Sequence, residues 1–211
     1  MPSRMTLPNK LTLARGAMGL ATFACLWTRR PAFFAAAFAL YVAATITDWV
    51  DGYIARRTHS MSPFGALADP IADKILVLGA LIACAHIPWL KIPLWAVFLI
   101  IVRELTVGGL RALAGAQGRV LAADRWGKWK MGIQSGSVIA ILLILVLVNT
   151  VGLSLPWPVP RLPRDLTLLS MAVTVVSGIL YMLNNQRLLE SSWGARRPGA
   201  HPLPPVEPRP D

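Results

Sequence analysis

The sequence has little cysteine and little negative charge. Its two cysteines, Cys25 and Cys84, lie in separate apolar runs without metal-ligand spacing, so we expect free thiols and neither a disulfide nor a zinc site. Only 10 residues are acidic against 21 basic ones, and charged residues make up only 15% of the chain. A soluble domain normally carries more charge, so the composition argues against one.

Long apolar segments take the place of charge. Hydrophobic residues make up 55% of the chain and the mean hydropathy is +0.55. A helix that spans a bilayer needs about 20 mostly apolar residues. Six such segments follow one another, at about Leu11–Trp27, Ala32–Ala55, Phe64–Ile87, Ile92–Leu113, Trp126–Thr150 and Leu166–Leu188. We therefore predict an all-α, polytopic membrane protein with six transmembrane helices in one domain over residues 1–190.

The basic residues predict the orientation in the membrane. If both termini lie on one side, most of the 21 basic residues gather there, and the opposite side keeps Arg29, Arg30, Lys91, Arg161 and Arg164. Cytoplasmic loops carry the excess of lysine and arginine, so both termini should be cytoplasmic and the membrane the inner (cytoplasmic) one. The net charge of +11 then faces anionic lipid headgroups and not nucleic acid. We expect the proline-rich tail, residues 191–211, to be disordered on the cytoplasmic side.

Four acidic residues lie near the ends of the second and third segments: Asp48, Asp51, Asp69 and Asp73. An ionised group in an apolar helix is costly, so its presence is a functional hypothesis by default. The first two acids are three residues apart and the last two are four apart, so each pair shares one helix face. The short connection over residues 58–63 predicts that the two helices are antiparallel neighbours whose acidic faces meet.

Four facing carboxylates repel one another unless cations lie between them. Ligand sets made only of oxygen favour hard ions, so we expect Mg²⁺ or Mn²⁺. Two such ions about 3.5–4 Å apart suit in-line displacement at phosphorus. The alternative is a set of surface carboxylates at helix ends that bind no metal.

The residues around these acids form a longer pattern, Asp48-Trp-Val-Asp51-Gly52-Tyr-Ile-Ala55-Arg56 and then Gly65-Ala-Leu-Ala-Asp69-Pro-Ile-Ala-Asp73. It resembles the signature of the CDP-alcohol phosphatidyltransferase family, D-x-x-D-G-x-x-A-R, eight residues, then G-x-x-x-D-x-x-x-D. Every fixed position is present. The resemblance implies the family's six-helix fold from about Pro8 to Leu189 and transfer of a phosphatidyl group from a CDP-linked lipid to an alcohol.

The resemblance also implies roles for single residues. All four aspartates bind metal, and Asp73 in addition removes the proton of the acceptor hydroxyl. Gly52 and Ala55 leave room for the nucleotide, and Arg56 lies near the phosphates. Gly65 either belongs to this CDP-lipid site or permits close helix packing.

The entry to the first helix is similar to a second family pattern, P-N-x-L-T-x-x-R. Asn9, Thr12 and Arg15 occupy its polar positions, so the resemblance implies that they help to bind the CDP part of the lipid. For Asn9 a helix cap is the alternative.

Basic residues in the fourth and fifth segments indicate the acceptor. Arg103 and Arg111 are eight residues apart and face roughly the same way, and Lys128 and Lys130 follow in the next segment. Fixed cations near a metal site suit an acceptor that carries its own phosphate. R-E-x(6)-R followed by G-K-x-K resembles the members of the family that use glycerol 3-phosphate, although Met131-Gly132 and Gly108-Gly109 depart from their pattern.

The expected reaction is attack by the 1-hydroxyl of glycerol 3-phosphate, deprotonated by Asp73, on the lipid-side phosphorus of CDP-diacylglycerol, with CMP leaving. Inositol phosphate, phosphatidylglycerol and serine remain as alternative acceptors. A cation transporter and an inactive lipid-binding relative are the alternatives outside this chemistry. The small residues Ala35–Ala37 are compatible with a homodimer, which is common in the family, or with packing inside one chain.

Overall fold

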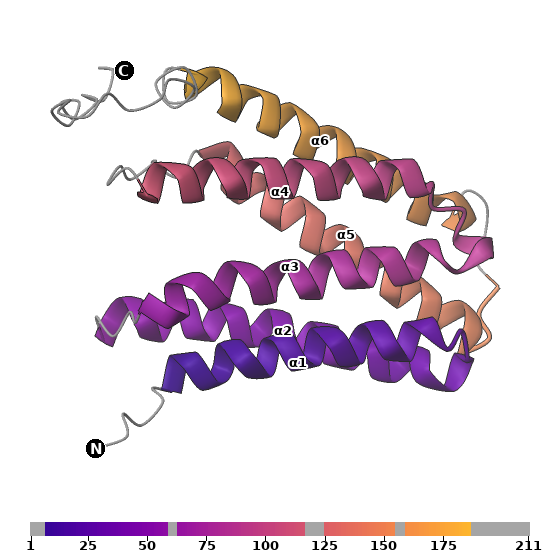
Figure 1. Cartoon of the computed structure of the whole chain (residues 1–211). Helices are drawn as coiled ribbons and strands as arrows, with labels where there is room; N and C mark the ends of the chain where they lie inside the picture. Colours follow the sequence, from indigo (N-terminus) through magenta and orange to yellow (C-terminus); the bar gives the residue numbers. More distant parts are fainter. Residues whose placement is uncertain (1–6, 59–62, 117–124, 155–158, 187–211) are drawn as a thin grey trace, which may run out of the picture.

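The computed structural model describes residues 7–58, 63–116, 125–154 and 159–186 (Figure 1). Within these ranges the chain forms α-helices, two short 3-10 helices and no strand. The α-helices are α1 (Leu7–Trp27), α2 (Pro31–Thr58), α3 (Pro63–Ala85), α4 (Leu94–Ala116), α5 (Arg125–Asn149) and α6 (Leu162–Asn184). The all-α prediction is confirmed, with helix ends a few residues from those expected. The tail over residues 191–211 lies outside the described residues.

Proline marks where several helices begin. Pro31 and Pro63 are the first residues of α2 and α3, where the ring sets a helical φ and the missing N–H has no helical partner to lose. Pro70 lies inside α3 instead, between Asp69 and Asp73. A proline in that position removes one backbone hydrogen bond from the helix, next to the acidic residues.

The helices run side by side, and the start of α1 lies at the same end of the bundle as the end of α6 (Figure 1). Among the described residues, α1 packs extensively against both α2 and α3. The direct pairing of α2 and α3 predicted from the short connection is not among the extensive helix contacts of the described residues, although side chains of both helices share one buried core. The spacing of the acids showed which face they share, but not that α1 would pack against both helices.

Close packing of α1 on α3 depends on a glycine. A Cβ on Gly19 would lie 3.0 Å from backbone atoms of Leu76, so only glycine lets the two helices approach this far. The buried core continues through Tyr41 on α2, Ile100 on α4 and Leu142 on α5, all with 0% exposure. This packing fixes the relative positions of the helices that carry the polar residues.

The outer surface of the bundle is apolar. On α4, for example, Leu94, Trp95, Phe98 and Leu105 are all more than half exposed. Three helical stretches in the described part of the chain are long and apolar enough to cross a bilayer: Pro31–Asp48, Trp129–Asn149 and Leu162–Asn184. By length and composition, such apolar helices indicate a membrane protein. The spans predicted for α3 and α4 include charged residues such as Asp73 and Arg103, which lower their apolar character.

Candidate functional site

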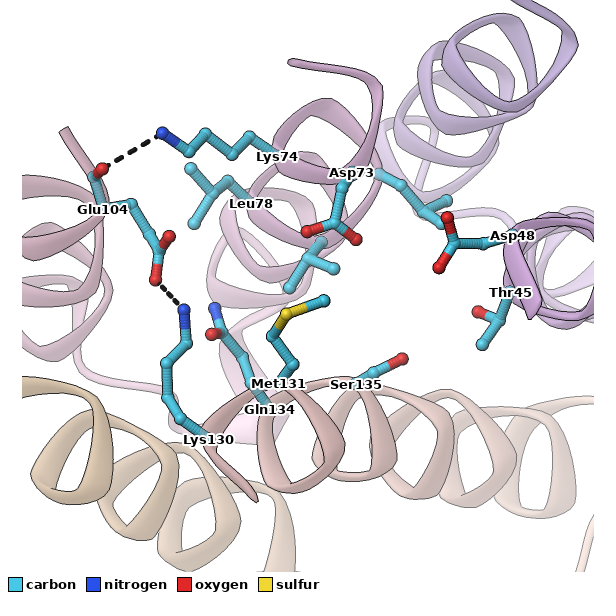
Figure 2. Close-up of a pocket in the computed structure, with 12 residues that line it drawn as sticks. Thr45, Asp48, Asp73, Lys74, Leu78, Glu104, Lys130, Met131, Gln134 and Ser135 are labelled. Carbon is cyan, nitrogen blue, oxygen red and sulfur yellow. Dashed lines mark hydrogen bonds and ion pairs between the residues drawn. The ribbon is translucent and has the colours of Figure 1, made fainter. Parts of the chain in front are cut away.

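A pocket of about 240 Å³ opens between four helices (Figure 2). Its lining residues are Thr45 and Asp48 from α2, Asp73, Lys74, Leu76, Val77 and Leu78 from α3, Glu104 from α4, and Lys130, Met131, Gln134 and Ser135 from α5. The pocket therefore combines carboxylates, ammonium groups and neutral polar groups above an apolar wall. A small phosphorylated molecule has both charge and hydroxyl groups that such a lining can bind.

Two of the predicted metal ligands lie in this pocket. The carboxylates of Asp48 and Asp73 come from different helices, and Figure 2 shows both of them pointing into the same space. The backbone of Asp51 belongs to α2, one turn beyond Asp48, but its side chain lies outside the described residues. One acid of each helix thus lies at the pocket, and Asp69 is not among the lining residues.

Arg15 connects the acids from the side of α1. Its guanidinium is 2% exposed and forms ion pairs with Asp48 and, at 3.2 Å from Nη2 to Oδ1, with Asp69. The hydroxyl of Thr12 donates to the same Asp69 oxygen. Thr12 and Arg15, predicted from the entry pattern of the first helix, therefore contact the residues predicted from the acidic pattern.

The donor set fits a hard divalent ion by its chemistry. Asp48 and Asp73 bring only carboxylate oxygens to one pocket, and such oxygens are the ligands that Mg²⁺ and Mn²⁺ prefer. Arg15 contacts one oxygen of Asp48, and a carboxylate offers two oxygens with about four lone-pair positions. Among the side chains that the structure describes, no three acidic, histidine or cysteine residues are already grouped around one point.

The remaining residues predicted for the CDP-lipid are placed only in part. Asn9 is buried in the first turns of α1, and Gly65 is buried near the start of α3. The backbones of Gly52, Ala55 and Arg56 form the last turns of α2, and their side chains are outside the described residues. All of these positions lie towards the helix ends that carry the acids.

Of the cations predicted for the acceptor, Lys130 lines the pocket, where its ammonium group pairs with Glu104. Arg103 and Arg111 share one face of α4, as expected, but that face meets α6. Arg103 donates to the hydroxyl of Ser177 at 2.9 Å, and Arg111 lies over the ring of Tyr181, 5.3 Å from its centroid. The structure does not bring these two arginines into the pocket lining. The side chain of Lys128 lies outside the described residues.

Several lining residues were not predicted, namely Thr45, Lys74, Gln134 and Ser135. Two signals in the sequence pointed to some of them. Gln134 is four residues after Lys130 and so shares its helix face, and Lys74 directly follows Asp73. Neither signal says that the side chain faces the acids across a pocket, because that depends on how α3 and α5 pack.

Comparisons with known proteins place this chain among phosphatidyltransferases. Residues 5–176 match a family model described as CDP-alcohol phosphatidyltransferase. The chain is 38% identical over 202 residues to the CDP-diacylglycerol–glycerol-3-phosphate 3-phosphatidyltransferase of Bacillus subtilis, a match that covers 88% of this chain and 98% of that protein.

Two further relatives match smaller shares of their own lengths. A Cereibacter sphaeroides protein with the same name is 38% identical over 144 residues, which cover 65% of this chain and 63% of the relative. The cardiolipin synthase (CMP-forming) of Oryza sativa subsp. japonica is 31% identical over 205 residues, which cover 89% of this chain and 60% of the relative.

Proposed function

The chain belongs to the CDP-alcohol phosphatidyltransferase family, and from that premise we propose that it is a phosphatidylglycerophosphate synthase. It transfers the phosphatidyl group of CDP-diacylglycerol to glycerol 3-phosphate, giving phosphatidylglycerophosphate and CMP in phospholipid biosynthesis. The observation that carries the proposal is the pocket itself. Asp48, Asp73 and Lys130 line it together, which supports a base and a phosphate-binding cation that act in one space.

In this proposal Asp48, Asp51, Asp69 and Asp73 hold two divalent ions, Mg²⁺ or Mn²⁺. When bound, these ions supply positive charge at the pyrophosphate as its bond breaks. Arg15 keeps Asp48 and Asp69 oriented from α1, and its own positive charge reduces the repulsion between their carboxylates. The four aspartates then need not approach one another closely before the ions bind.

The chemical step follows from the acid–base chemistry of Asp73. Its carboxylate takes the proton of the 1-hydroxyl of glycerol 3-phosphate, and the hydroxyl oxygen forms a bond to the phosphorus that carries the diacylglycerol. The bond between that phosphorus and the bridging oxygen of CMP breaks, and CMP leaves with the electron pair. A base positioned within hydrogen-bonding reach of the hydroxyl contributes about 10²- to 10⁴-fold to such a reaction.

The CDP part of the lipid binds, in this proposal, at the ends of α1, α2 and α3. Thr12 and Arg15 support it because they already contact Asp69. Asn9, Gly52, Ala55, Arg56 and Gly65 complete the set. The lack of bulky side chains at the two glycines and the alanine leaves room for the nucleotide, and Arg56 offers its charge to the phosphates.

The phosphate of the acceptor binds to the basic residues of α4 and α5. Lys130 is the member of the predicted set whose position in the pocket supports this role most directly. We retain Lys128, Arg103 and Arg111 in the proposal. In this proposal the two arginines act from the interface between α4 and α6, where Arg103 contacts Ser177 and Arg111 contacts Tyr181.

The proposal includes the inner (cytoplasmic) membrane as the location, with six spans and both termini cytoplasmic. The start of α1 and the end of α6 lie at one end of the bundle, which supports termini on the same side (Figure 1). Membrane lipids then surround the exposed apolar faces, and a lipid substrate reaches the pocket while its acyl chains stay in the bilayer. A homodimer is part of the same proposal, through contact of exposed helix faces.

A second candidate function differs only in the acceptor. The similarity to a cardiolipin synthase extends over 89% of this chain, so phosphatidylglycerol is the alternative to glycerol 3-phosphate. Both acceptors carry a phosphate and a hydroxyl. The opening of the pocket in the membrane, and not the metal site, then decides which of them enters.

The test is a product assay with the purified full-length protein in detergent micelles. CDP-diacylglycerol is offered together with glycerol 3-phosphate, phosphatidylglycerol, inositol phosphate and serine, and the lipid products are identified by mass. Phosphatidylglycerophosphate as the main product supports the proposal. Cardiolipin as the main product supports the alternative, and metal flux in vesicles without any lipid product contradicts both.

A further inference from the structure

Glu104 lies where three helices meet at the pocket wall. Its backbone carbonyl accepts a hydrogen bond from Lys74 Nζ of α3 at 3.0 Å, and its carboxylate pairs with Lys130 Nζ of α5 (Figure 2). Both lysines line the pocket on the side away from Asp48. One residue of α4 therefore holds the two ammonium groups of this wall.

Glu104 is itself anchored to the sixth helix through its neighbour in the chain. Arg103 donates to the Glu104 carboxylate at 3.3 Å through Nη1 and to the hydroxyl of Ser177 at 2.9 Å through Nη2. The arginine lies across Gly178, where a Cβ would come within 2.6 Å of its Cγ atom. Ser177 and Gly178 thus fix Arg103, and Arg103 fixes the carboxylate of Glu104.

Lys74 depends on a glycine in the same way. A Cβ on Gly108 would lie 2.7 Å from Lys74 Nζ, whereas a Cβ on the next residue, Gly109, would have nothing within 4 Å. The absence of a side chain at Gly108 lets the ammonium group rest against α4 and reach the Glu104 carbonyl. The paired glycines, which depart from the pattern expected beside Arg111, therefore have different surroundings.

These groups are mostly removed from solvent, so their positions are set by their partners. The side chains of Lys130, Arg103 and Glu104 are 7%, 11% and 13% exposed. A free lysine side chain samples many rotamers, so holding it in one position beforehand removes an entropy cost from binding. An ammonium group has three donors, and one of them is used on Glu104 by each lysine. The other donors of a held lysine are available for a phosphate oxygen.

We propose that Glu104 is a positioning residue that holds Lys74 and Lys130 as a fixed pair of cations on the pocket wall, and that this pair selects acceptors carrying a phosphate. The inference rests on the proposed function, which it deepens by adding Lys74, Glu104 and Gly108 to the acceptor side of the site. Glu104 acts through the lysines and does not itself contact the acceptor.

The test compares Glu104→Gln and Gly108→Ala with the wild-type protein and with the matched control Gly109→Ala. Each of the first two changes disturbs one of the two lysines. We expect each to raise the KM for the acceptor about tenfold, equivalent to about 1.4 kcal/mol, with kcat and the KM for CDP-diacylglycerol changed less than about twofold. The inhibition constant of inorganic phosphate, a probe that does not depend on which acceptor is used, should rise by a similar factor. Gly109→Ala should match the wild type.

The product of the wild type tests the proposed function, whereas the kinetic constants of the variants test the role of Glu104 and Gly108. If the wild type prefers phosphatidylglycerol, the proposed function fails. The KM for that acceptor and the inhibition constant of inorganic phosphate, each compared between variant and wild type, still test whether Glu104 and Gly108 position the two lysines. An unchanged inhibition constant of phosphate in both variants overturns the inference. A fall in kcat without a selective rise in the KM for the acceptor also overturns it, because that pattern indicates a general structural defect. A Gly109→Ala variant as impaired as Gly108→Ala also overturns it.

Discussion

Arg15 on α1 holds Asp69 on α3 at two points. Its Nη2 atom donates to the carboxylate at 3.2 Å and to the backbone carbonyl at 3.3 Å. The other terminal nitrogen pairs with Asp48 on α2. This one guanidinium therefore joins the two helices whose acids define the family pattern.

Replacing Arg15 by lysine should therefore impair catalysis although the charge is kept. Lysine is a single point donor and does not reproduce the planar fork that contacts two helices. We expect kcat/KM for CDP-diacylglycerol to fall about tenfold, the equivalent of losing one charged hydrogen bond at a partly exposed carboxylate. The exposed Arg30→Lys is the matched control and should retain full activity. Equal activity of both variants would show that Arg15 has no orienting role.

Asp73→Asn keeps the shape of the side chain and removes the base. Turnover should fall by about 10²- to 10⁴-fold, the range that a positioned general base contributes. The variant should still be extracted from membranes as a folded protein with the wild-type thermal midpoint. Asp165→Asn, in the exposed first turn of α6, is the control for loss of one carboxylate and should turn over normally. Near-normal turnover by Asp73→Asn would reject the assignment of the base.

Removal of divalent ions should abolish activity without unfolding the protein. Exhaustive chelation is expected to stop product formation, and added Mg²⁺ or Mn²⁺ should restore it, since the carboxylates of Asp48 and Asp73 offer only oxygen ligands. Asp48→Asn should require a higher concentration of the ion for half-maximal activity, because one charged ligand is lost. Product formation that continues in a metal-free sample contradicts the metal site.

Gly19→Ala tests the packing that brings Arg15 to the acids. The added Cβ meets backbone atoms of Leu76 at 3.0 Å, and backbone cannot rotate away as a side chain can. Overpacking of this kind typically destabilises by about 1–3 kcal/mol, which should appear as a lower temperature of half-inactivation in detergent. Gly136→Ala, where a Cβ meets nothing within 4 Å, should be neutral or slightly stabilising. If the two variants had the same temperature of half-inactivation, the close approach of α1 and α3 would not limit the stability of the protein.

The spacing of residues along the chain predicted much of the site, for a physical reason. A helix repeats every 3.6 residues, so the intervals between Asp48 and Asp51 and between Asp69 and Asp73 determine which faces are acidic in any fold that keeps these helices. The same period placed Arg103 and Arg111 on one face of α4. Apolar length predicted membrane helices in the same local way, because the length and composition of each segment can be judged by itself.

Which face meets which neighbour was decided only by tertiary packing. Arg15 reaches both acidic helices because Gly19 lets α1 approach α3, and Arg103 turns to α6 because Gly178 leaves space for it there. Lys74 becomes a pocket residue because Gly108, more than 30 positions away in the chain, has no side chain. Contacts of this kind depend on the shapes of surfaces that are distant in sequence, and the period of a single helix carries no information about them.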